Sequence, residues 1–127
     1  MTSAPVETEL FRPFVRAGDF VFVSGQASID PQGRLVRGTF EQEMRRSIEN
    51  VRAVLAVAGL TLMDVVKVGS YVQDAADLPE YNRLYMEYFA ALRPARTTIT
   101  RCLPETVKFE MDVVAYREYT PSLRSEG

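Results

Sequence analysis

The C-terminal part of the chain alternates apolar and polar positions between residues 107 and 116. The apolar side chains share one parity: Val107, Phe109, Met111, Val113 and Ala115. The other parity is polar over most of its length: Lys108, Glu110 and Asp112. Because successive side chains of a strand point to opposite faces of a sheet, this pattern predicts a half-buried strand from Val107 to Tyr116.

Four earlier segments are also predicted as strands. Pro13–Ala17 and Phe20–Gln26 flank a Gly-Asp turn and predict a hairpin, whereas Arg96–Thr100 follows a proline that disfavours helix. The second hairpin strand is predicted to be apolar on both faces. Phe20 and Phe22 are expected on one face, and Val21 and Val23 on the other. The strand predicted at Val65–Gln73 is also expected to be apolar on both faces. Val66, Val68 and Val72 are expected on one face, and Val65 and Tyr71 on the other.

Two segments carry helical periodicity. Thr39, followed three residues later by Gln42, predicts a capping box, and Gly59 is expected just beyond the end of this first helix. Its predicted buried stripe is Met44, Ile48, Val51, Leu55 and Ala58. The second helix is expected to start with Asp77 as its N-cap and Pro79 in its first turn. Its predicted stripe is Tyr81, Leu84, Tyr85, Tyr88 and Leu92.

The predicted order β-β-α-β-α-β-β indicates an α+β fold, a mixed sheet with both helices on one face. We expect a single domain over residues 1–127, with its core at about 11–117 and a tail at 118–127 that is loose from Pro121. Strands that are apolar on both faces normally have both faces covered. The density of valine therefore favours a second copy of the chain over the open face, although scattered exposed apolar residues on a monomer are the common alternative.

Composition narrows the possible chemistry. The chain has 127 residues, a net charge of −2 and a sequence pI of about 5.2, which provides no basic footprint for nucleic acid. It has no apolar run that would span a membrane and no signal-peptide pattern, so we expect a cytoplasmic protein. The chain has no histidine and a single cysteine, Cys102. This composition excludes Ser-His and Cys-His nucleophile systems and a zinc site built from Cys and His ligands. We expect no metal and no cofactor.

Four polar or backbone positions are candidates for a site, each with a simpler alternative. Arg96 has a planar donor fork that suits a carboxylate, but such an arginine is more often solvated or ion-paired. Glu110 would position water if an oligomer buried it, and otherwise pairs with Lys108 or a neighbouring strand. Ser24 and Gly25 form a strand end that would also allow close approach of a ligand to the backbone.

Several stretches, in order, resemble the YjgF/Rid family of reactive intermediate deaminases: "VFVSGQASIDPQGRLV", "SIENVRAVLAVAGLTLMDVVKVGSYVQD", "YNRLYMEYFA", "RPARTT" and "VKFEMDVVAY". The resemblance runs from about Phe11 to Tyr116. It implies a chorismate-mutase-like α+β fold and a homotrimer, with its sheets inward and a cleft between each pair of subunits. It further implies hydrolysis of enamines and imines, such as 2-aminoacrylate, to keto acids and ammonia by a metal-independent hydrolase.

The resemblance also assigns residues. Arg96 falls on the family's carboxylate-binding arginine, Glu110 on the glutamate that handles water, and Ser24, Gly25 and Thr98 on backbone contacts near the cleft. A small carboxylate-bearing substrate is implied as the partner. The chain departs from many deaminases in three ways: Phe14 replaces a tyrosine, Thr98 replaces a cysteine, and the loop between Arg96 and Glu110 is one residue shorter.

Three other functions compete with general imine hydrolysis. The changed cleft at Phe14 favours a pathway-specific deaminase for a larger substrate of the 2-aminomuconate type. A trimer that binds a small metabolite without turnover is a second alternative. Ribonuclease or translation-inhibitor activity, attributed to some relatives, is disfavoured by the acidic charge balance.

Overall fold

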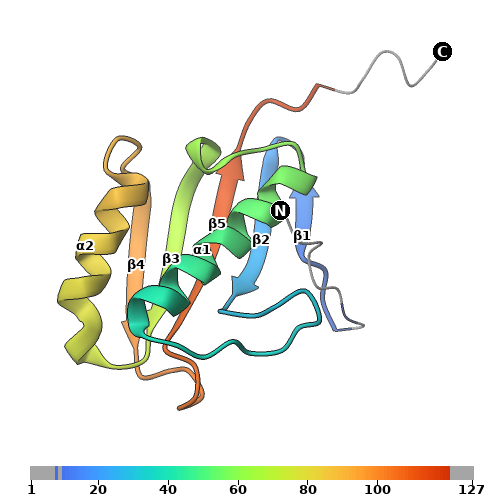
Figure 1. Ribbon diagram of the computed structural model, residues 1–127. Helices are drawn as coiled ribbons and strands as arrows, with labels where there is room; N and C mark the ends of the chain where they lie inside the picture. The colour runs from blue at the N-terminus through green and yellow to red at the C-terminus, as the bar shows by residue number, and fades with distance from the viewer. Residues whose placement is uncertain (1–7, 9, 121–127) are drawn as a thin grey trace.

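A computed structural model describes residues 8 and 10–120, and the part of the expected tail from Pro121 lies outside the described residues. The elements follow the predicted order (Figure 1): β1 (Phe14–Ala17), β2 (Phe20–Gln26), α1 (Phe40–Val57), β3 (Val65–Val72), α2 (Leu78–Phe89), β4 (Ala95–Thr100) and β5 (Phe109–Tyr116). Single 3₁₀ turns precede β3 and α2: η1 (Leu62–Asp64) and η2 (Ala75–Asp77).

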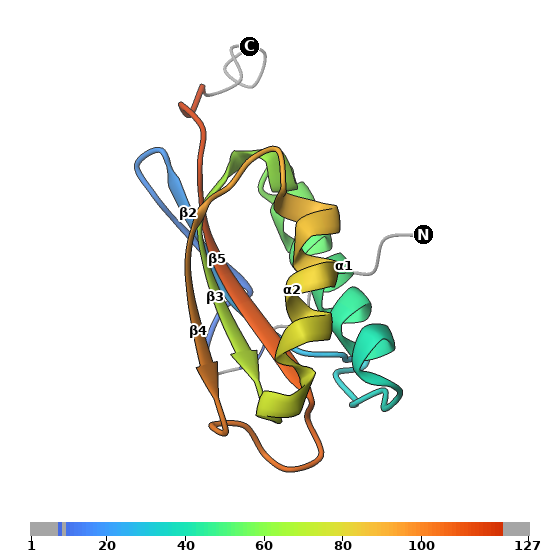
Figure 2. The same cartoon turned by 90° about the vertical axis from the view of Figure 1, so that its left-hand side faces the viewer.

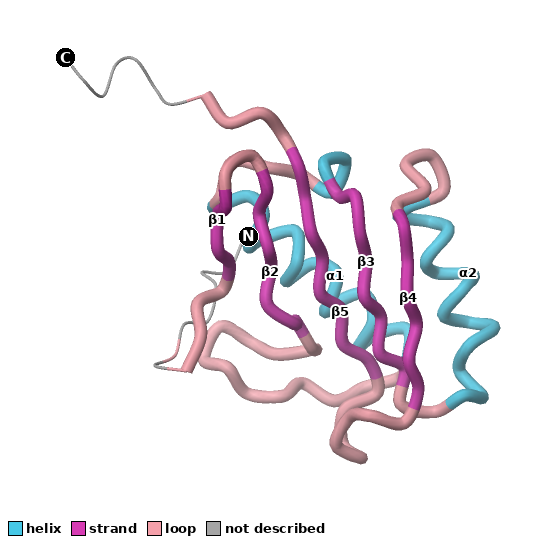
Figure 3. Tube along the Cα trace, turned by 180° about the vertical axis from the view of Figure 1, so that it is seen from behind, coloured by secondary structure: helices cyan, strands magenta, loops and turns pink. Residues whose placement is uncertain are grey.

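The strands form one mixed sheet in the order β1-β2-β5-β3-β4. Only the β3–β4 pair is parallel among the described strands, because α2 carries the chain back across the sheet between them. Seen edge-on, α1 and α2 lie on the same side of the sheet (Figure 2). From behind, the strands lie in front of both helices and their other face is open (Figure 3). The predicted α+β architecture is confirmed.

The hydrophobic core fills the space between the sheet and the helices. Helix α1 contributes Phe40, Met44, Ile48, Val51, Val54 and Leu55, and α2 contributes Tyr81, Leu84, Tyr85 and Phe89. The remaining members of the two predicted stripes, Ala58, Tyr88 and Leu92, are half-buried against this core. The sequence periodicity therefore identified the inward face of both helices.

The first helix begins and ends as predicted, and the second has Asp77 at its predicted N-cap position and Pro79 in its first turn. Gln42 donates its backbone N–H to the Thr39 hydroxyl at 3.2 Å, and Thr39 returns the bond to the Gln42 side chain at 2.9 Å. Gly59, with φ of 85°, follows the C-cap of α1. The Asp77 side chain accepts no capping bond, however, so the predicted capping interaction is wrong: the backbone of Asp77 is already helical because η2 runs directly into α2. Asp74 instead caps η2 by accepting from Ala76 N–H at 2.9 Å.

The predicted faces of β3 are wrong at its first two residues. The register between β3 and β5 shifts there, with Val65 opposite Ala115 and Lys67 opposite Val114. This irregularity puts Val65 under the helices in the core, and leaves Val66 43% exposed. A bulge moves the side chains that precede it to the opposite face of the sheet. The apolar pattern therefore assigned Val65 and Val66 to the wrong faces at this end of the strand.

The open face of the sheet carries exposed aromatic and aliphatic side chains. Val15, Phe20, Phe22 and Tyr116 are each 42–46% exposed. Phe20 packs against Tyr116 with ring centroids 5.0 Å apart and against Phe22 at 6.4 Å. The expectation that β2 is apolar on both faces is therefore confirmed: Val21 and Val23 are buried, and both phenylalanines lie on the other side.

Candidate functional site

Arg96 lies near the start of β4, at the free edge of the sheet and on the side of the helices. It is opposite Val68 in the parallel β3–β4 register, and Val68 is buried in the core. Its guanidinium carbon lies 5.1 Å from the Tyr81 ring centroid and 4.7 Å from that of Tyr85. Arg96 Nη1 donates to Asn82 Oδ1 at 3.0 Å. Stacking and one hydrogen bond together fix the plane of the guanidinium.

The sequence of α2 builds this support. Tyr81 and Tyr85 are four residues apart and therefore share one face of the helix, with Asn82 beside them. The Tyr81 hydroxyl is held by Thr98 Oγ1 at 2.8 Å, so Thr98, a predicted substrate-binding residue, also anchors this tyrosine. Sequence reasoning missed Asn82 as a partner of the arginine. The one sequence feature that could have indicated Asn82 is its place as a polar residue beside the apolar stripe of α2.

The outward side of the Arg96 guanidinium is open. Arg96 is exposed, and within residues 8 and 10–120 it has no ion-pair partner. A guanidinium has five N–H donors, and the bond to Asn82 uses one of them. The arrangement is suited to receiving a carboxylate in the bidentate geometry that arginine favours.

Glu110 lies on the opposite, open face of the sheet. It is half-buried on β5, directly opposite Tyr71 of β3. Burial raises its pKa above the usual glutamate value, and the negative charge of Asp112 raises it further. The alternative pairing with Lys108 is not observed, because Lys108 Nζ lies 3.4 Å from Glu43, a buried carboxylate of α1.

Gly25 makes room for the Glu110 carboxylate. A Cβ atom at Gly25 would overlap Oε2 of Glu110, so the carboxylate lies directly against the glycine backbone. This close approach explains a glycine at the end of β2. The irregular β2–β5 register between Val23 and Gln26 brings the two residues together, and that irregularity was invisible in the sequence pattern.

A second carboxylate stands beside Glu110 on the same face. Asp112 accepts a hydrogen bond from the Tyr71 hydroxyl at 2.7 Å. That bond, together with burial, raises the pKa of Tyr71 to about 12, so its hydroxyl remains a donor at neutral pH. Gly69 leaves space for Asp112 as Gly25 does for Glu110. The open face thus combines an apolar region with two neighbouring acidic side chains, of which Asp112 is held by the Tyr71 hydroxyl.

The remaining predicted residues lie near the β1 edge. Ser24 donates its hydroxyl to the Arg12 carbonyl at 2.6 Å and its N–H to the Pro13 carbonyl at 2.9 Å, which holds the segment before β1. Phe14 is opposite Val23 and packs against the core on the helix side. Neither of these side chains reaches Arg96, because β1 and β4 are the two opposite edges of the sheet.

One chain therefore does not bring the two principal candidates together. Arg96 is on the helix side of β4, Glu110 is on the open side of β5, and β3 lies between them. A site that contains both side chains needs two copies of the chain. Each candidate has its own supporting residues, Asn82 for Arg96 and Gly25 for Glu110.

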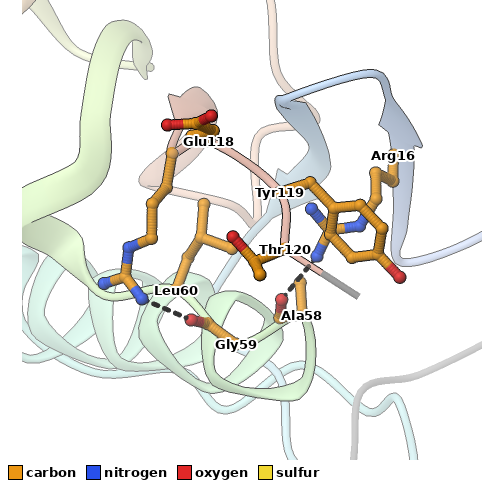
Figure 4. A pocket seen from close by; sticks show the side chains of 8 residues that line it. Arg16, Ala58, Gly59, Leu60, Glu118, Tyr119 and Thr120 are labelled. Atoms are coloured by element: carbon orange, nitrogen blue, oxygen red, sulfur yellow. Dashed lines mark hydrogen bonds between the residues drawn. The ribbon is translucent and has the colours of Figure 1, made fainter. Parts of the chain in front are cut away.

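A separate pocket of about 360 Å³ lies at the C-terminal end of α1 (Figure 4). Arg16 Nη2 donates to the Ala58 carbonyl at 2.6 Å, and the Tyr119 ring centroid lies 4.5 Å from its guanidinium. Arg117 Nη1 donates to the Gly59 carbonyl at 3.1 Å. The last turn of α1 has no basic residue of its own, so these two arginines complement the negative end of its dipole.

Within the part of the chain that the structure describes, no group of three or more His, Cys, Asp or Glu side chains could hold a metal ion. None of the described helices has the length and apolar character needed to cross a membrane.

Three comparisons relate this geometry to known proteins. Residues 1–117 match the family model described as Endoribonuclease L-PSP. A RutC family protein of Pyrococcus abyssi is 40% identical over 117 residues, covering 91% of this chain and 92% of that protein. The crystal structure of Escherichia coli TdcF with bound serine is 30% identical with a TM-score of 0.78, covering 92% and 95% of the two chains. RidA from the Antarctic bacterium Psychrobacter sp. is 27% identical with a TM-score of 0.80, covering 92% and 96%.

Proposed function

Because this chain belongs to the Rid family, also named YjgF, RutC or L-PSP, we propose that it hydrolyses reactive 2-imino and 2-enamino acids to 2-keto acids and ammonia. The family includes candidate reactive intermediate deaminases. The observation that carries the proposal is the Arg96 guanidinium, which is stacked on two tyrosines, held by Asn82 and open to solvent. The net charge of −2 gives no corresponding support for binding RNA.

In this mechanism Arg96 binds the substrate carboxylate. The stacked tyrosines hold the guanidinium plane, so a carboxylate would lose little freedom on forming two parallel hydrogen bonds. Hydrogen bonds to charged groups are worth about 1.5–3 kcal/mol each. This anchor fixes the imine carbon relative to the group that delivers water.

Glu110 acts as the general base. Its raised pKa makes it a stronger proton acceptor than an exposed glutamate. With the imine protonated at its nitrogen, Glu110 takes one proton from water while the water oxygen bonds to the imine carbon, which yields a neutral carbinolamine. Glu110 then gives this proton to the amino group. The C–N bond breaks as the hydroxyl returns its own proton to Glu110, so ammonia leaves and the carbonyl of the keto acid forms. An enamine enters the same sequence after protonation at its carbon, which converts it to the imine.

The proposal includes a homotrimer with a cleft between adjacent copies. Arg96 and Glu110 lie on opposite sides of the sheet in one chain, so we assign them to different copies within each cleft. The open face supports this assembly because Phe20, Phe22 and Tyr116 are exposed together on it. The substrate-binding roles of Ser24, Gly25, Phe14 and Thr98 belong to the same proposal.

The decisive test combines turnover with binding. Imines of several amino acids are generated in solution by an amino-acid oxidase, and their decay is followed with and without the protein. Arg96→Lys keeps the charge but loses the planar fork, so we expect kcat/KM to fall about 10- to 100-fold. Calorimetry with pyruvate or 2-oxobutyrate should show a parallel loss of affinity. Equal affinities for wild type and Arg96→Lys, at matched oligomer content, would remove Arg96 from the site.

A second function, binding without turnover, is favoured by the relative whose structure holds serine. A single-turnover experiment separates the two functions. Protein in excess over imine should consume it faster than buffer does if the chain is a hydrolase. Tight binding of keto or amino acids with no acceleration would instead indicate a metabolite-binding protein.

A further inference from the structure

The connection between α2 and β4 forms a pocket of about 300 Å³ beside Arg96. Figure 1 shows α2 lying next to β4, with this connection joining their ends. The pocket is lined by two cations, three apolar or aromatic side chains of α2, and two other residues: Arg93, Arg96, Tyr85, Met86, Phe89, Asn82 and Pro94. No carboxylate lines it. Two positive charges beside apolar walls make this pocket suited to an anionic ligand that carries a hydrocarbon part.

Arg93 occupies an unusual backbone position. Its φ is 51°, in the left-handed region that glycine favours, and its N–H donates to the Phe89 carbonyl at 2.8 Å, closing the turn after α2. Pro94 follows and restricts the backbone between the two arginines. The chain has arginine at this position although glycine would be less strained.

The side chain of Arg93 is exposed, and within the described residues it has no ion-pair partner. The other two cation-lined pockets differ in the groups that surround their cations. A pocket of about 470 Å³ at the other end of β4 combines Arg101 and Lys108 with three carboxylates: Asp74, Asp77 and Glu105. In the pocket of Figure 4, both arginines donate to carbonyls of the α1 terminus. The pocket beside Arg96 therefore has the greater capacity for an added negative charge.

We propose that this pocket selects substrates with two carboxylates, and that Arg93 is the second anchor. The inference rests on the proposed function: Arg96 binds the carboxylate next to the imine, and Arg93 binds the distal one. Met86 and Phe89 contact the short hydrocarbon chain between them. The preferred substrates are then imines of amino dicarboxylic acids, and the products are 2-keto dicarboxylic acids and ammonia.

A simpler role for Arg93 makes a different prediction. A cation after the end of α2 complements the helix dipole, whatever the ligand. In that case its replacement changes stability and affects all substrates equally. A second anchor instead changes selectivity, the ratio of kcat/KM for a dicarboxylate imine to that for a monocarboxylate imine.

The experiment replaces Arg93 by glycine and by lysine. Glycine suits a φ of 51°, so Arg93→Gly should fold at least as well as wild type. Arg101→Gly is the matched control because Arg101 also has a positive φ, 63°, but lines the other pocket. Oxidases generate 2-iminoglutarate and 2-iminosuccinate for one arm, and 2-iminopropionate and 2-iminobutyrate for the other. Arg93→Gly should lower kcat/KM for the first pair about 10- to 100-fold and for the second less than about twofold.

Arg93→Lys should retain part of the dicarboxylate preference, and Arg101→Gly should retain all of it. Equal effects of Arg93→Gly on both substrate pairs would overturn the second anchor while leaving imine hydrolysis in place. If wild type hydrolyses no imine, the proposed function is wrong. Calorimetry with 2-oxoglutarate and pyruvate then tests whether Arg93 binds a second carboxylate. Weaker binding of 2-oxoglutarate alone in Arg93→Gly would support the anchor. Unchanged binding of both would reject it.

Discussion

The two halves of the candidate site differ in how far one chain completes them. On the helix side of β4, Arg96 already has its partners: Asn82, Tyr81 and Tyr85 fix it from a single neighbouring helix. On the open side of β5, Glu110 has room provided by Gly25 and a charged neighbour in Asp112, but it is only half-buried. The proposed anchor is thus organised by the folded chain, whereas the environment of the proposed base depends on whether a second copy covers the open face of the sheet.

The largest effect should come from preventing that coverage. Phe22 is 46% exposed on the open face, so Phe22→Asp should leave the chain folded. A buried, unpaired charge would oppose association of the open faces, and we expect loss of the proposed trimer together with nearly all of the proposed imine hydrolysis. Light scattering and the imine assay measure both. Met63→Asp is the matched control, because Met63 is 64% exposed on η1. Full activity of a monomeric Phe22→Asp would show that one chain suffices.

The next largest effect should come from the base itself. Glu110→Gln keeps the shape and removes proton acceptance, so imine hydrolysis should fall about 100-fold or more. Keto-acid affinity should remain close to that of wild type, because the anchor lies on the other side of the sheet. Glu105→Gln, the same change in an exposed loop, should alter neither quantity. Unchanged turnover in an intact Glu110→Gln trimer would return Glu110 to a structural role.

A smaller effect should come from the support of the anchor. Asn82→Ala removes one hydrogen bond to Arg96 but leaves the stacking in place, so kcat/KM should fall about 2- to 10-fold. Asn82→Asp should do more, because a carboxylate beside Arg96 competes with the substrate carboxylate. Steady-state kinetics with one imine gives the ranking. If Asn82→Ala were the weaker enzyme of the two, competition for the guanidinium would not be the controlling factor.

The smallest effect is a pH-dependent difference in stability. A carboxyl whose pKa is raised by folding holds its proton more tightly in the folded state. The stability that this tighter proton binding adds to the folded state is complete below the pKa of about 4.3 in the unfolded chain. It is lost as the pH rises through the higher pKa of the folded state. Glu110→Gln should therefore gain in melting temperature relative to wild type as the pH is raised from about 4 to about 7. A difference in melting temperature between Glu110→Gln and wild type that stays constant over this pH range would contradict the raised pKa of Glu110.

Local sequence signals were sufficient wherever a few neighbouring residues decide the structure. Thr39 and Gln42 formed the predicted capping box, and the alternation over β5 gave the correct faces. The failures involve longer range. The bulge beside Val66 depends on the register with β5, and Asp77 does not cap α2 because a preceding turn had already set its backbone.

The candidate site shows the same division. Arg96 and Glu110 were chosen by residue type and by resemblance, and the alternation correctly placed Glu110 away from the core. The sequence could not reveal that Asn82 holds Arg96, because that bond depends on how α2 packs beside an edge strand. Nor could it reveal that Lys108 pairs with Glu43, which lies 65 residues away in the chain. Contacts of this kind are set by the tertiary packing.

The position of β5 has a consequence for synthesis of the protein. It is the last strand to leave the ribosome, yet it lies in the middle of the sheet, between β2 and β3. Until it emerges, the N-terminal hairpin and the β3-α2-β4 unit share no strand pairing. From the synthesis of β3 until β5 emerges, the nascent chain therefore presents the edges of β2 and β3 unpaired, a state open to misassociation. We expect the sheet to close only once β5 has emerged, so a chain that still lacks β5 is the species that a chaperone would protect.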